Sequence, residues 1–500
     1  MRIALISPFP DITVFGLRTM SAYLRERGHW TRMIFLPDPA CDEDYGEERY
    51  RPETLRQLVA LCRDVDLVGI TLMTNYFAAA RQITHAIHAA TSVPVVWGGV
   101  HATICPDECI VHADIVCVGD GEEALLDLAD ALGRGAAIDA LANLWVRAGD
   151  GAISRNPPRP LLRDLDRYPA PDYSLADHHF MVADGTITPF TRELTERHLR
   201  TGTVSNLLGK MGYQTMTGRG CPHKCSYCAN DALKNLYDKR GYLRWRSVEH
   251  VIDELEQVKH RFPDIGFVWI SDDAFFSRPS ASLAAFCTAY KERIGLPFSC
   301  LASPLTVTEE KMALLVDAGL VYVQMGIESG SARMQALYNR ARMDNRRVLR
   351  AARIINRYRA RMFPPSYDFL LDVPYERTED TLESLRLIAR LPKPYRLQPF
   401  SLVLYPGTEL HRMGVRDGHV RDAHRDVYAK SYNMRAGSYP NLLFALAQGG
   451  RMPGPLLRLL ASRPLGRVLA AAPLRPGFAW LYRALRALKA RLRPVGGRAA

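Results

Sequence analysis

A short loop between residues 217 and 230 holds three cysteines and constrains what the rest of the chain can be. It reads TGRGCPHKCSYCAN, so three residues separate Cys221 from Cys225 and two separate Cys225 from Cys228. Sulfurs on so short a loop can converge on one inorganic centre. Structural zinc sites usually close with four ligands, whereas a 4Fe-4S cluster on three cysteines leaves one iron open for a cofactor or substrate. The spacing therefore favours a cluster with an open iron.

Residues beside the cysteines support this interpretation. Gly218 and Gly220 allow a tight turn after the apolar residues 213–216, and Tyr227 precedes the last cysteine. The loop resembles that of the radical S-adenosylmethionine (radical SAM) superfamily, which has the same three-then-two spacing and an aromatic residue before the third cysteine. From the residues alone, the alternative is a zinc knuckle with His223 as the fourth ligand.

Length and composition set outer limits on the chain. Its 500 residues, 47% of them hydrophobic, can bury a large core and suggest two to four domains. The first ten residues contain one Arg and no signal-peptide pattern, which together with ten cysteines favours a reducing, cytoplasmic compartment. No apolar run approaches the roughly 18 residues of a transmembrane helix, so we expect none.

The formal net charge of +12 comes from the end of the chain. Residues 451–500 carry eleven Lys and Arg and no acidic residue, which leaves 54 basic against 53 acidic residues in the first 450. A neutral body offers no basic surface for DNA or RNA, so we expect no nucleic-acid partner.

Strands and helices alternate over residues 1–140. Strands are expected at 2–6, 31–36, 66–72, 93–97 and 114–118. Alternation with short loops predicts an α/β fold with a Rossmann-like, doubly wound parallel sheet, whose ligands bind at the carboxyl ends of the strands. The residues at or just after those ends include Thr71, Thr74, Gly98, Gly99, His101, Gly119, Gly121 and Glu122.

Three stretches of this domain, GLRTMSAYLRERGH, WGGVHAT and VGDGEEALLDL, resemble the cobalamin-binding domain that precedes many radical SAM domains. The resemblance implies that the eight strand-end residues named above contact cobalamin, the glycines letting backbone N–H groups approach its phosphate-bearing tail. The chain has no Asp-x-His-x-x-Gly motif, so no histidine of that motif is expected under the cobalt. The alternative is a Rossmann-like domain that has lost its corrinoid, and His101 alone is weak evidence.

Residues 141–210 are expected to be a connector, because five prolines fall between positions 157 and 171. A second alternating series fills residues 211–410, with strands expected at 213–216, 266–270, 297–302, 321–327, 366–372 and 396–404. Six such strands predict a partial βα barrel, in which chemistry gathers on the loops after the strands. Those loops carry the three cysteines, Asp272, Asp273, Glu328 and Thr408.

The radical SAM resemblance implies roles for four residues beside the cluster. The amino and carboxylate groups of SAM would chelate the open iron, with Tyr227 beside the cluster. Glu328 would accept hydrogen bonds from the ribose hydroxyls, and Asp272 and Asp273 would meet the SAM ammonium. The alternative for Glu328 is a salt bridge in the mouth of the barrel.

Taken together, the two resemblances, which cover residues 1 to about 410, predict a cobalamin-associated radical SAM enzyme. One electron would cleave SAM at the 4Fe-4S cluster, the 5′-deoxyadenosyl radical would abstract hydrogen from an unactivated carbon, and methylcobalamin would deliver a methyl group. The expected partners are a reductant protein such as flavodoxin or ferredoxin and a small-molecule or lipid-like substrate. The alternatives are a radical cyclase or rearrangement enzyme on a hydrophobic substrate, or a non-catalytic cobalamin sensor.

Residues 411–500 are expected to form a helical region with a basic amphipathic tail. Between residues 478 and 493, helical spacing places Phe478, Leu481, Leu485, Leu488 and Leu492 on one face, with Arg483, Arg486, Ala490 and Arg493 opposite. Two interpretations stand side by side. The helix lies on the inner, anionic face of a membrane, which would make the protein peripheral, or it docks on the barrel with its arginines in solvent.

Overall fold

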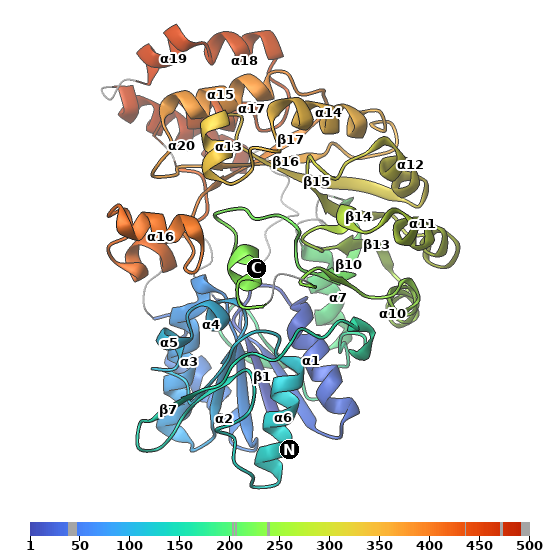
Figure 1. The fold of residues 1–500 in the computed structure, drawn as a ribbon, viewed down its shortest axis with the longest axis vertical. Coiled ribbons are helices and arrows are strands. Elements are labelled where there is room, and N and C mark those ends of the chain that lie inside the picture. Colours follow the sequence, from blue (N-terminus) through green and yellow to red (C-terminus); the bar gives the residue numbers. More distant parts are fainter. Residues whose placement is uncertain are drawn as a thin grey trace. The chain divides into compact units, whose positions relative to one another are not determined.

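The computed structural model describes residues 1–38, 48–202, 205, 208–237, 241–435, 437–470 and 474–491. These residues form two compact units, and the chain passes between them more than once. The first unit consists of Met1–Thr203, Tyr227–Arg246 and Leu404–Lys430, and the second of Val204–Ser226, Ser247–Val403 and Ser431–Ala500. Each unit is built on its own sheet (Figure 1).

The first unit contains a nine-stranded sheet in the order β7-β6-β5-β4-β3-β1-β2-β8-β9. Neighbouring strands from β5 to β2 in this order run parallel, which confirms the predicted doubly wound core. The strands are β1 (Arg2–Ser7), β2 (Trp30–Phe35), β3 (Leu67–Thr71), β4 (Val95–Gly98), β5 (Ile115–Cys117), β6 (Leu144–Arg147), β7 (Ile153–Arg155), β8 (His179–Met181) and β9 (Ile187–Pro189).

Helices connect these strands, and α1 packs beside α6 while α2 packs beside α3. The strand order reverses direction at β1, between β3 and β2, and such a switch point is where open parallel sheets bind ligands. The helices of this unit are α1 (Phe15–Glu26), α2 (Pro52–Cys62), α3 (Phe77–Ala90), α4 (Val100–Ile104), α5 (Pro106–Cys109), α6 (Glu122–Gly133), α7 (Arg192–Thr201), α9 (Ala229–Lys234) and α16 (Glu409–Arg416).

The segment expected to be a connector instead extends this sheet at both edges. Strands β6 and β7 add antiparallel to β5, and β8 adds parallel to β2 and is followed by antiparallel β9. Most of its aromatic residues are buried, with Phe190 packed edge-on against Phe35 and Phe180. The prolines mark only the stretch of chain that passes from one edge to the other.

The second unit contains six parallel strands in the order β10-β13-β14-β15-β16-β17, which confirms the predicted partial barrel. The strands are β10 (Met211–Thr215), β13 (Ile265–Ile270), β14 (Phe298–Ala302), β15 (Leu320–Glu328), β16 (Ser366–Leu371) and β17 (Arg396–Ser401). The last strand ends three residues earlier than expected. Two short strands, β11 (Gly218–Arg219) and β12 (Arg244–Trp245), precede and follow the cysteine loop along the chain.

Side-chain caps define where several barrel helices begin. Ser247, Thr308 and Asp344 each accept a hydrogen bond from the backbone N–H three residues later, which satisfies an otherwise unpaired donor of the first turn. The barrel helices are α10 (Val248–Arg261), α11 (Ser280–Ala289), α12 (Glu309–Asp317), α13 (Ala332–Leu337), α14 (Asn345–Asn356) and α15 (Thr378–Ile388).

In the described part of the second unit, four helices follow the barrel: α17 (Tyr439–Ala447), α18 (Gly454–Leu460), α19 (Arg463–Leu469) and α20 (Arg475–Arg491). The expected tail helix is present, and it packs against α17 through Phe478, a member of the expected apolar face. The Phe478 ring lies 5.3 Å from that of Tyr439, and Tyr482 is buried, whereas Leu481 is 39% exposed. The rest of the expected apolar face, from Leu485 onward, lies outside the described side chains.

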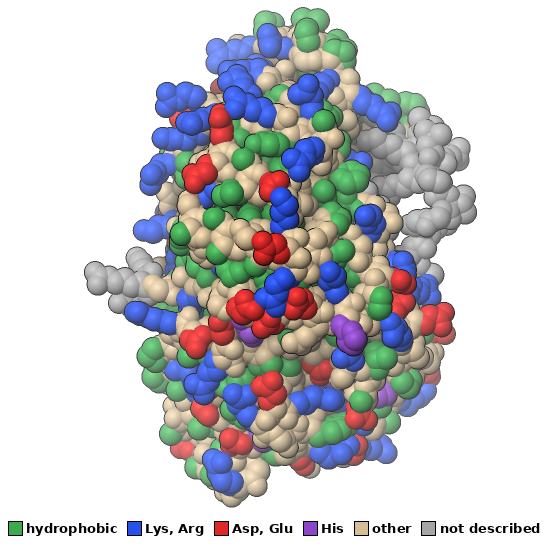
Figure 2. Space-filling model, turned by 90° about the vertical axis from the view of Figure 1, so that its right-hand side faces the viewer, with side chains coloured by type: hydrophobic (Ala, Val, Ile, Leu, Met, Phe, Trp, Pro, Cys, Tyr) green, Lys and Arg blue, Asp and Glu red, His purple; other side chains and the backbone are tan. Residues whose placement is uncertain are grey.

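Hydrophobic and basic side chains share the surface at the α18–α19 end of this unit, at the top of Figure 2. Within the described part of the chain, no helix combines the length and the apolar character needed to cross a membrane.

Candidate functional site

The cysteine loop begins at a buried group of three side chains. Asp272, two residues after β13, accepts hydrogen bonds from the Thr217 backbone N–H and hydroxyl, both at 2.5 Å. Arg278, which is 1% exposed, donates to the Thr217 carbonyl at 3.0 Å. Burial raises the pKa of Asp272 to about 6, although the Thr217 hydrogen bonds act in the opposite direction. These contacts fix the start of the loop at the carboxyl end of β13.

The two predicted acids after β13 therefore differ in their surroundings. Both oxygens of Asp272 accept hydrogen bonds from Thr217, so Asp272 holds the loop in place. Asp273 is exposed. Adjacent residues of an extended segment point to opposite sides, which explains why only one of the pair is buried. Contact with the SAM ammonium stays a prediction, better suited to Asp273.

Hydrogen-bond donors reach the cysteine sulfurs. Arg340, which is 5% exposed, donates to the Sγ atom of buried Cys225 at 3.5 Å and to the Gly326 carbonyl at 2.7 Å. The amide of Asn230 donates to the Sγ atom of Cys228 at 3.8 Å. Donors to sulfur stabilise thiolates and tune iron–sulfur clusters, so these surroundings fit the predicted cluster. The sequence analysis missed Arg340, which lies 115 residues from Cys225 along the chain.

The zinc-knuckle alternative finds no support in the geometry. The Nε2 atom of His223, the proposed fourth ligand, lies 3.0 Å from the Ser303 hydroxyl and shares a hydrogen bond with it. Among the described residues, the only group of three ligand atoms within 4.8 Å of one another contains none of the loop cysteines. Among these residues, the four ligands that a zinc knuckle needs therefore do not converge at the loop.

Glu328 ends β15 with a left-handed backbone, at a φ of 67°. Such a conformation costs a non-glycine residue about 1–3 kcal/mol and is often found at functional sites. Its carboxylate lies 3.9 Å from the Arg340 guanidinium, so the salt bridge that we considered as an alternative is present. The ribose contact stays a prediction, as does the SAM contact of half-buried Tyr227. Thr408, by contrast, caps α16 by accepting a hydrogen bond from the His411 N–H.

Three polar side chains lie together on the inner face of β15, β16 and β17. Alternate residues of β15 and β16 are partly exposed while their neighbours are buried against helices, which identifies the inner face. The Gln324 amide donates to Asp368 Oδ2 at 2.8 Å and to Gln398 Oε1 at 3.3 Å. Asp368 Oδ1 is buried with no hydrogen-bond partner among the described residues. Burial, and then the charge of Glu328, raises the pKa of Asp368 to about 7.

The eight predicted cobalamin residues divide into three sets. Thr71 and Gly98 end β3 and β4 and are partly exposed, and space beside Gly98 is limited only by the Cys117 Cβ atom at 3.8 Å. Thr74, His101 and Glu122 are buried, with exposed fractions of 4% or less. The open strand-end edge at Thr71 and Gly98 fits the backbone approach that a nucleotide tail needs.

The other glycines are required by contacts within the protein. A Cβ atom on Gly99 would lie 2.7 Å from the Leu72 carbonyl oxygen, so this glycine allows α4 to start against β3. The Tyr237 hydroxyl occupies the space beside Gly119 and accepts a hydrogen bond from the Asp120 N–H at 3.1 Å. Gly121 faces the end of the Met20 side chain. A glycine pattern in sequence cannot distinguish packing of this kind from ligand approach.

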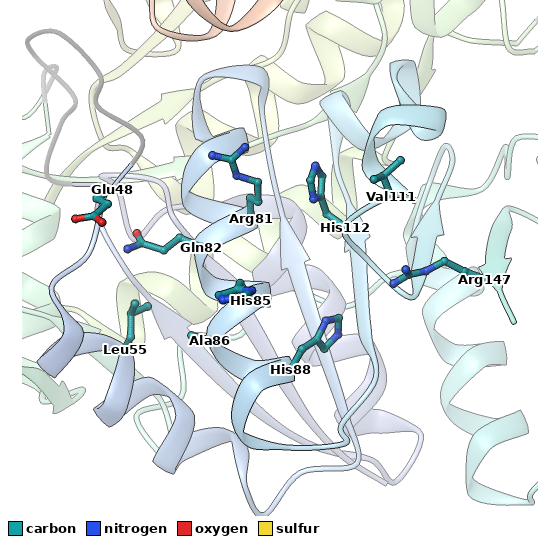
Figure 3. Close-up of a pocket in the computed structure, with 10 residues that line it drawn as sticks. All are labelled: Glu48, Leu55, Arg81, Gln82, His85, Ala86, His88, Val111, His112 and Arg147. Atoms are coloured by element: carbon teal, nitrogen blue, oxygen red, sulfur yellow. The ribbon is translucent and has the colours of Figure 1, made fainter. Parts of the chain in front are cut away.

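A cavity of about 610 Å³ lies elsewhere on the first unit (Figure 3). Its lining contains none of the predicted site residues and is rich in basic groups: Arg81, His85, His88, His112 and Arg147. His88 and Arg147 both pair with Asp114, at 2.9 and 3.4 Å. Burial, and then the charge of Arg81, lowers the pKa of His112.

Comparison with known proteins finds similarity to two families. Residues 1–129 match the family model of the B12 binding domain, and residues 215–388 match that of the radical SAM superfamily. The two matches cover the segments that the sequence analysis assigned to cobalamin and to the cluster.

Two curated relatives align with most of the chain. An uncharacterised methyltransferase of Pyrococcus horikoshii is 27% identical over 353 residues, which is 69% of this chain and 69% of the relative. A bacteriochlorophyllide d C-8(2)-methyltransferase of Chlorobaculum tepidum is 23% identical over 361 residues, 70% of this chain and 68% of the relative.

Solved structures share the fold at lower identity. The radical SAM methyltransferase TsrM of Kitasatospora setae, solved with cobalamin and a [4Fe-4S] cluster, aligns with a TM-score of 0.64 and 18% identity, over 84% of this chain and 79% of its own. The cobalamin-dependent radical enzyme OxsB, solved with aqua-cobalamin and SAM, aligns with a TM-score of 0.63 and 17% identity, over 89% of this chain and 66% of its own.

The raised pKa of Asp368 makes a testable contribution to stability. Between about pH 4 and pH 7 the folded protein keeps a proton on Asp368 that the unfolded chain has lost, so stability falls as pH rises through this window. Asp368→Asn should therefore raise the melting temperature more at pH 8 than at pH 5. In free energy of unfolding, the gain at pH 8 should exceed the gain at pH 5 by on the order of 2 kcal/mol. The exposed Glu310→Gln is the control, and an equal effect of Asp368→Asn at both pH values would contradict the assignment.

Proposed function

We propose that this chain, a radical SAM enzyme with an N-terminal B12-binding domain, is a cobalamin-dependent C-methyltransferase. The arrangement of the cysteine loop carries the proposal. Asp272 holds the start of the loop at a strand end, and Arg340 donates a hydrogen bond to the sulfur of Cys225. The same chain matches the B12 binding domain. The methyltransferase names of both curated relatives support the choice of reaction.

The residues of the chain position the reactants and keep water away. Cys221, Cys225 and Cys228 would hold the cluster, while Arg340 would offset its negative charge and orient Glu328 toward SAM. Thr71 and Gly98 would support cobalamin at the open edge of the first sheet. When bound, the cluster and SAM supply the radical that removes hydrogen from an unactivated carbon, and cobalamin supplies the methyl group. A reductant protein such as flavodoxin or ferredoxin would provide the electron.

The inner face of the barrel suggests what kind of substrate is bound. Gln324, Asp368 and Gln398 form a polar group in which one carboxylate oxygen has no partner among the described residues, and a ligand N–H or O–H would satisfy it. We therefore favour a small molecule with such a donor near the reacting carbon. A radical cyclisation or rearrangement would use the same residues, whereas a non-catalytic cobalamin sensor would not need a cysteine loop held this firmly.

The C-terminal helices support a second proposal, peripheral contact with an anionic membrane. Large apolar side chains are exposed along them, including Leu459 at 62%, Val468 at 66% and Trp480 at 66%. Arg451 and Arg458 lie exposed on the same helical region, in which no acidic residue occurs after residue 450. Apolar surface together with basic charge is the combination that binds anionic lipid surfaces.

Isotope labelling tests the proposed reaction. Anaerobically reconstituted enzyme is incubated with a reductant, a cell metabolite extract and SAM carrying either a CH₃ or a CD₃ methyl group. Mass spectrometry should show 5′-deoxyadenosine and a new product that is three mass units heavier with the labelled cofactor. Cys225→Ala should abolish both, because two cysteines cannot anchor the cluster, whereas Cys287→Ala, a buried thiol outside the loop, should retain them.

Two outcomes would count against this function. SAM cleavage at the full rate by Cys225→Ala would contradict the assignment of the cluster to the three cysteines of the loop. Products that form with the wild-type enzyme but gain no label would contradict methyl transfer and indicate cyclisation or rearrangement.

A matched pair of variants on α20 tests the membrane proposal. Trp480→Ser should at least halve co-sedimentation with anionic liposomes and leave the melting temperature unchanged, because this side chain is exposed. Tyr482→Ala should lower the melting temperature, since the Tyr482 ring is buried and its hydroxyl donates to the Met434 carbonyl at 3.4 Å. Equal sedimentation of wild-type and Trp480→Ser protein would contradict the membrane proposal, and the tail would then have a role only in the fold.

A further inference from the structure

We propose that His101, Cys105 and Glu108 form a zinc-binding site in the first unit, separate from the iron–sulfur loop. Their ligand atoms, an imidazole nitrogen, a thiol sulfur and a carboxylate oxygen, all lie within 4.8 Å of one another. His101 lies in α4, Cys105 links the two helices and Glu108 lies in α5, so one local segment brings all three together. No other described group of three such residues is this close.

The His101 ring is already oriented as a ligand. Its Nδ1 atom lies 3.1 Å from the Thr74 hydroxyl, and rings of Phe77 and Tyr428 pack edge-on against it at 5.3 Å. Its Nε2 atom has no hydrogen-bond partner among the described residues. Because the residue is 0% exposed, solvent does not satisfy this atom either. When Nδ1 carries the proton and donates to Thr74, Nε2 presents its lone pair, which is the arrangement seen in metal-binding histidines.

Glu108 provides the oxygen ligand and has its own supporting contact. Its Oε2 atom accepts a hydrogen bond from the Tyr428 hydroxyl at 2.5 Å and lies 3.6 Å from His101 Nε2. A carboxylate fixed in this way by a hydroxyl donor is typical of the surroundings of a metal ligand.

The chemistry of the three ligands selects the ion. Nitrogen, sulfur and oxygen donors together suit Zn²⁺, whereas Ca²⁺ and Mg²⁺ prefer oxygen alone. In a tetrahedral zinc site, neighbouring ligand atoms are roughly 3.5 Å apart, so the side chains need to close by about 1 Å. The Glu108 side chain is 37% exposed, which gives the ion a path from solvent and leaves a position for water.

A buried His–Glu ion pair is the simpler explanation, and it accounts for less. The separation of 3.6 Å exceeds a normal hydrogen bond, and the pair gives no role to the half-buried Cys105 beside it. Zinc would satisfy the Nε2 atom and use the thiol. Because Tyr428 lies on the 404–430 segment, the site would also fasten that segment to α4 and α5 within the first unit.

Metal analysis and X-ray absorption test the site. Full-length enzyme with its iron–sulfur cluster reconstituted is exposed to Zn²⁺ and desalted, and zinc and iron are measured by mass spectrometry. We expect one zinc per chain beyond the iron, with a zinc absorption-edge spectrum fitted by one sulfur and two or three nitrogen or oxygen neighbours. Cys105→Ser should weaken zinc retention at least tenfold, and Cys109→Ser, a buried thiol outside the group, should retain it.

The results separate this proposal from that for the cluster. Zinc retained by Cys105→Ser as well as by the wild type would overturn the site, as would a shell of three sulfurs, which would place the ion in the iron–sulfur loop. No zinc in the wild-type protein would leave His101 and Glu108 as an ion pair. Zinc bound at His101 leaves the iron content unchanged, whereas zinc bound in the loop lowers it, so the iron measurement distinguishes failure of this site from failure of the proposed methyl-transfer function.

Discussion

The buried contact between Asp272 and Thr217 is the interaction on which the proposed chemistry depends. Burying a carboxyl group is costly unless its oxygens are hydrogen-bonded, and here the Thr217 N–H and hydroxyl supply both bonds while Arg278 holds the Thr217 carbonyl. The result is a fixed start for a loop that must present three sulfurs. A loop that moved by even 1 Å would misplace the reacting groups, so the rigidity of this anchor matters more than its net contribution to stability.

From this anchor, the second unit gathers its functional groups at the ends and inner faces of parallel strands. Arg340 connects Cys225 with the strand-end residue Glu328, and the polar group around Asp368 lies on the inner face of the next strands. In the first unit, close packing at Gly99 and Gly119 shapes the corresponding strand-end edge. Both units therefore use the same rule: the sheet fixes positions, and the loops supply the chemistry.

The features that could be predicted from the sequence are those that depend on residues close together along the chain. The loop spacing gave the cluster, and alternating strands and helices gave both sheets, because these signals lie within a few residues of one another. The sequence analysis missed Arg340, which lies 115 residues from its partner Cys225. It also missed the Gln324–Asp368–Gln398 group, whose members come together only through the register of β15, β16 and β17. It also put Leu481 on the packing face of the tail helix, whereas this side chain is 39% exposed, since burial depends on neighbours that are distant in sequence.

Electron paramagnetic resonance of the iron-loaded, dithionite-reduced protein, recorded before and after addition of SAM, tests the central claim most directly. The claim is that the loop holds a cluster with one iron open to SAM. It predicts about four irons per chain and the signal of a reduced 4Fe-4S cluster that changes when SAM binds. A signal that SAM leaves unchanged, or a loop that binds zinc and no iron, would contradict it.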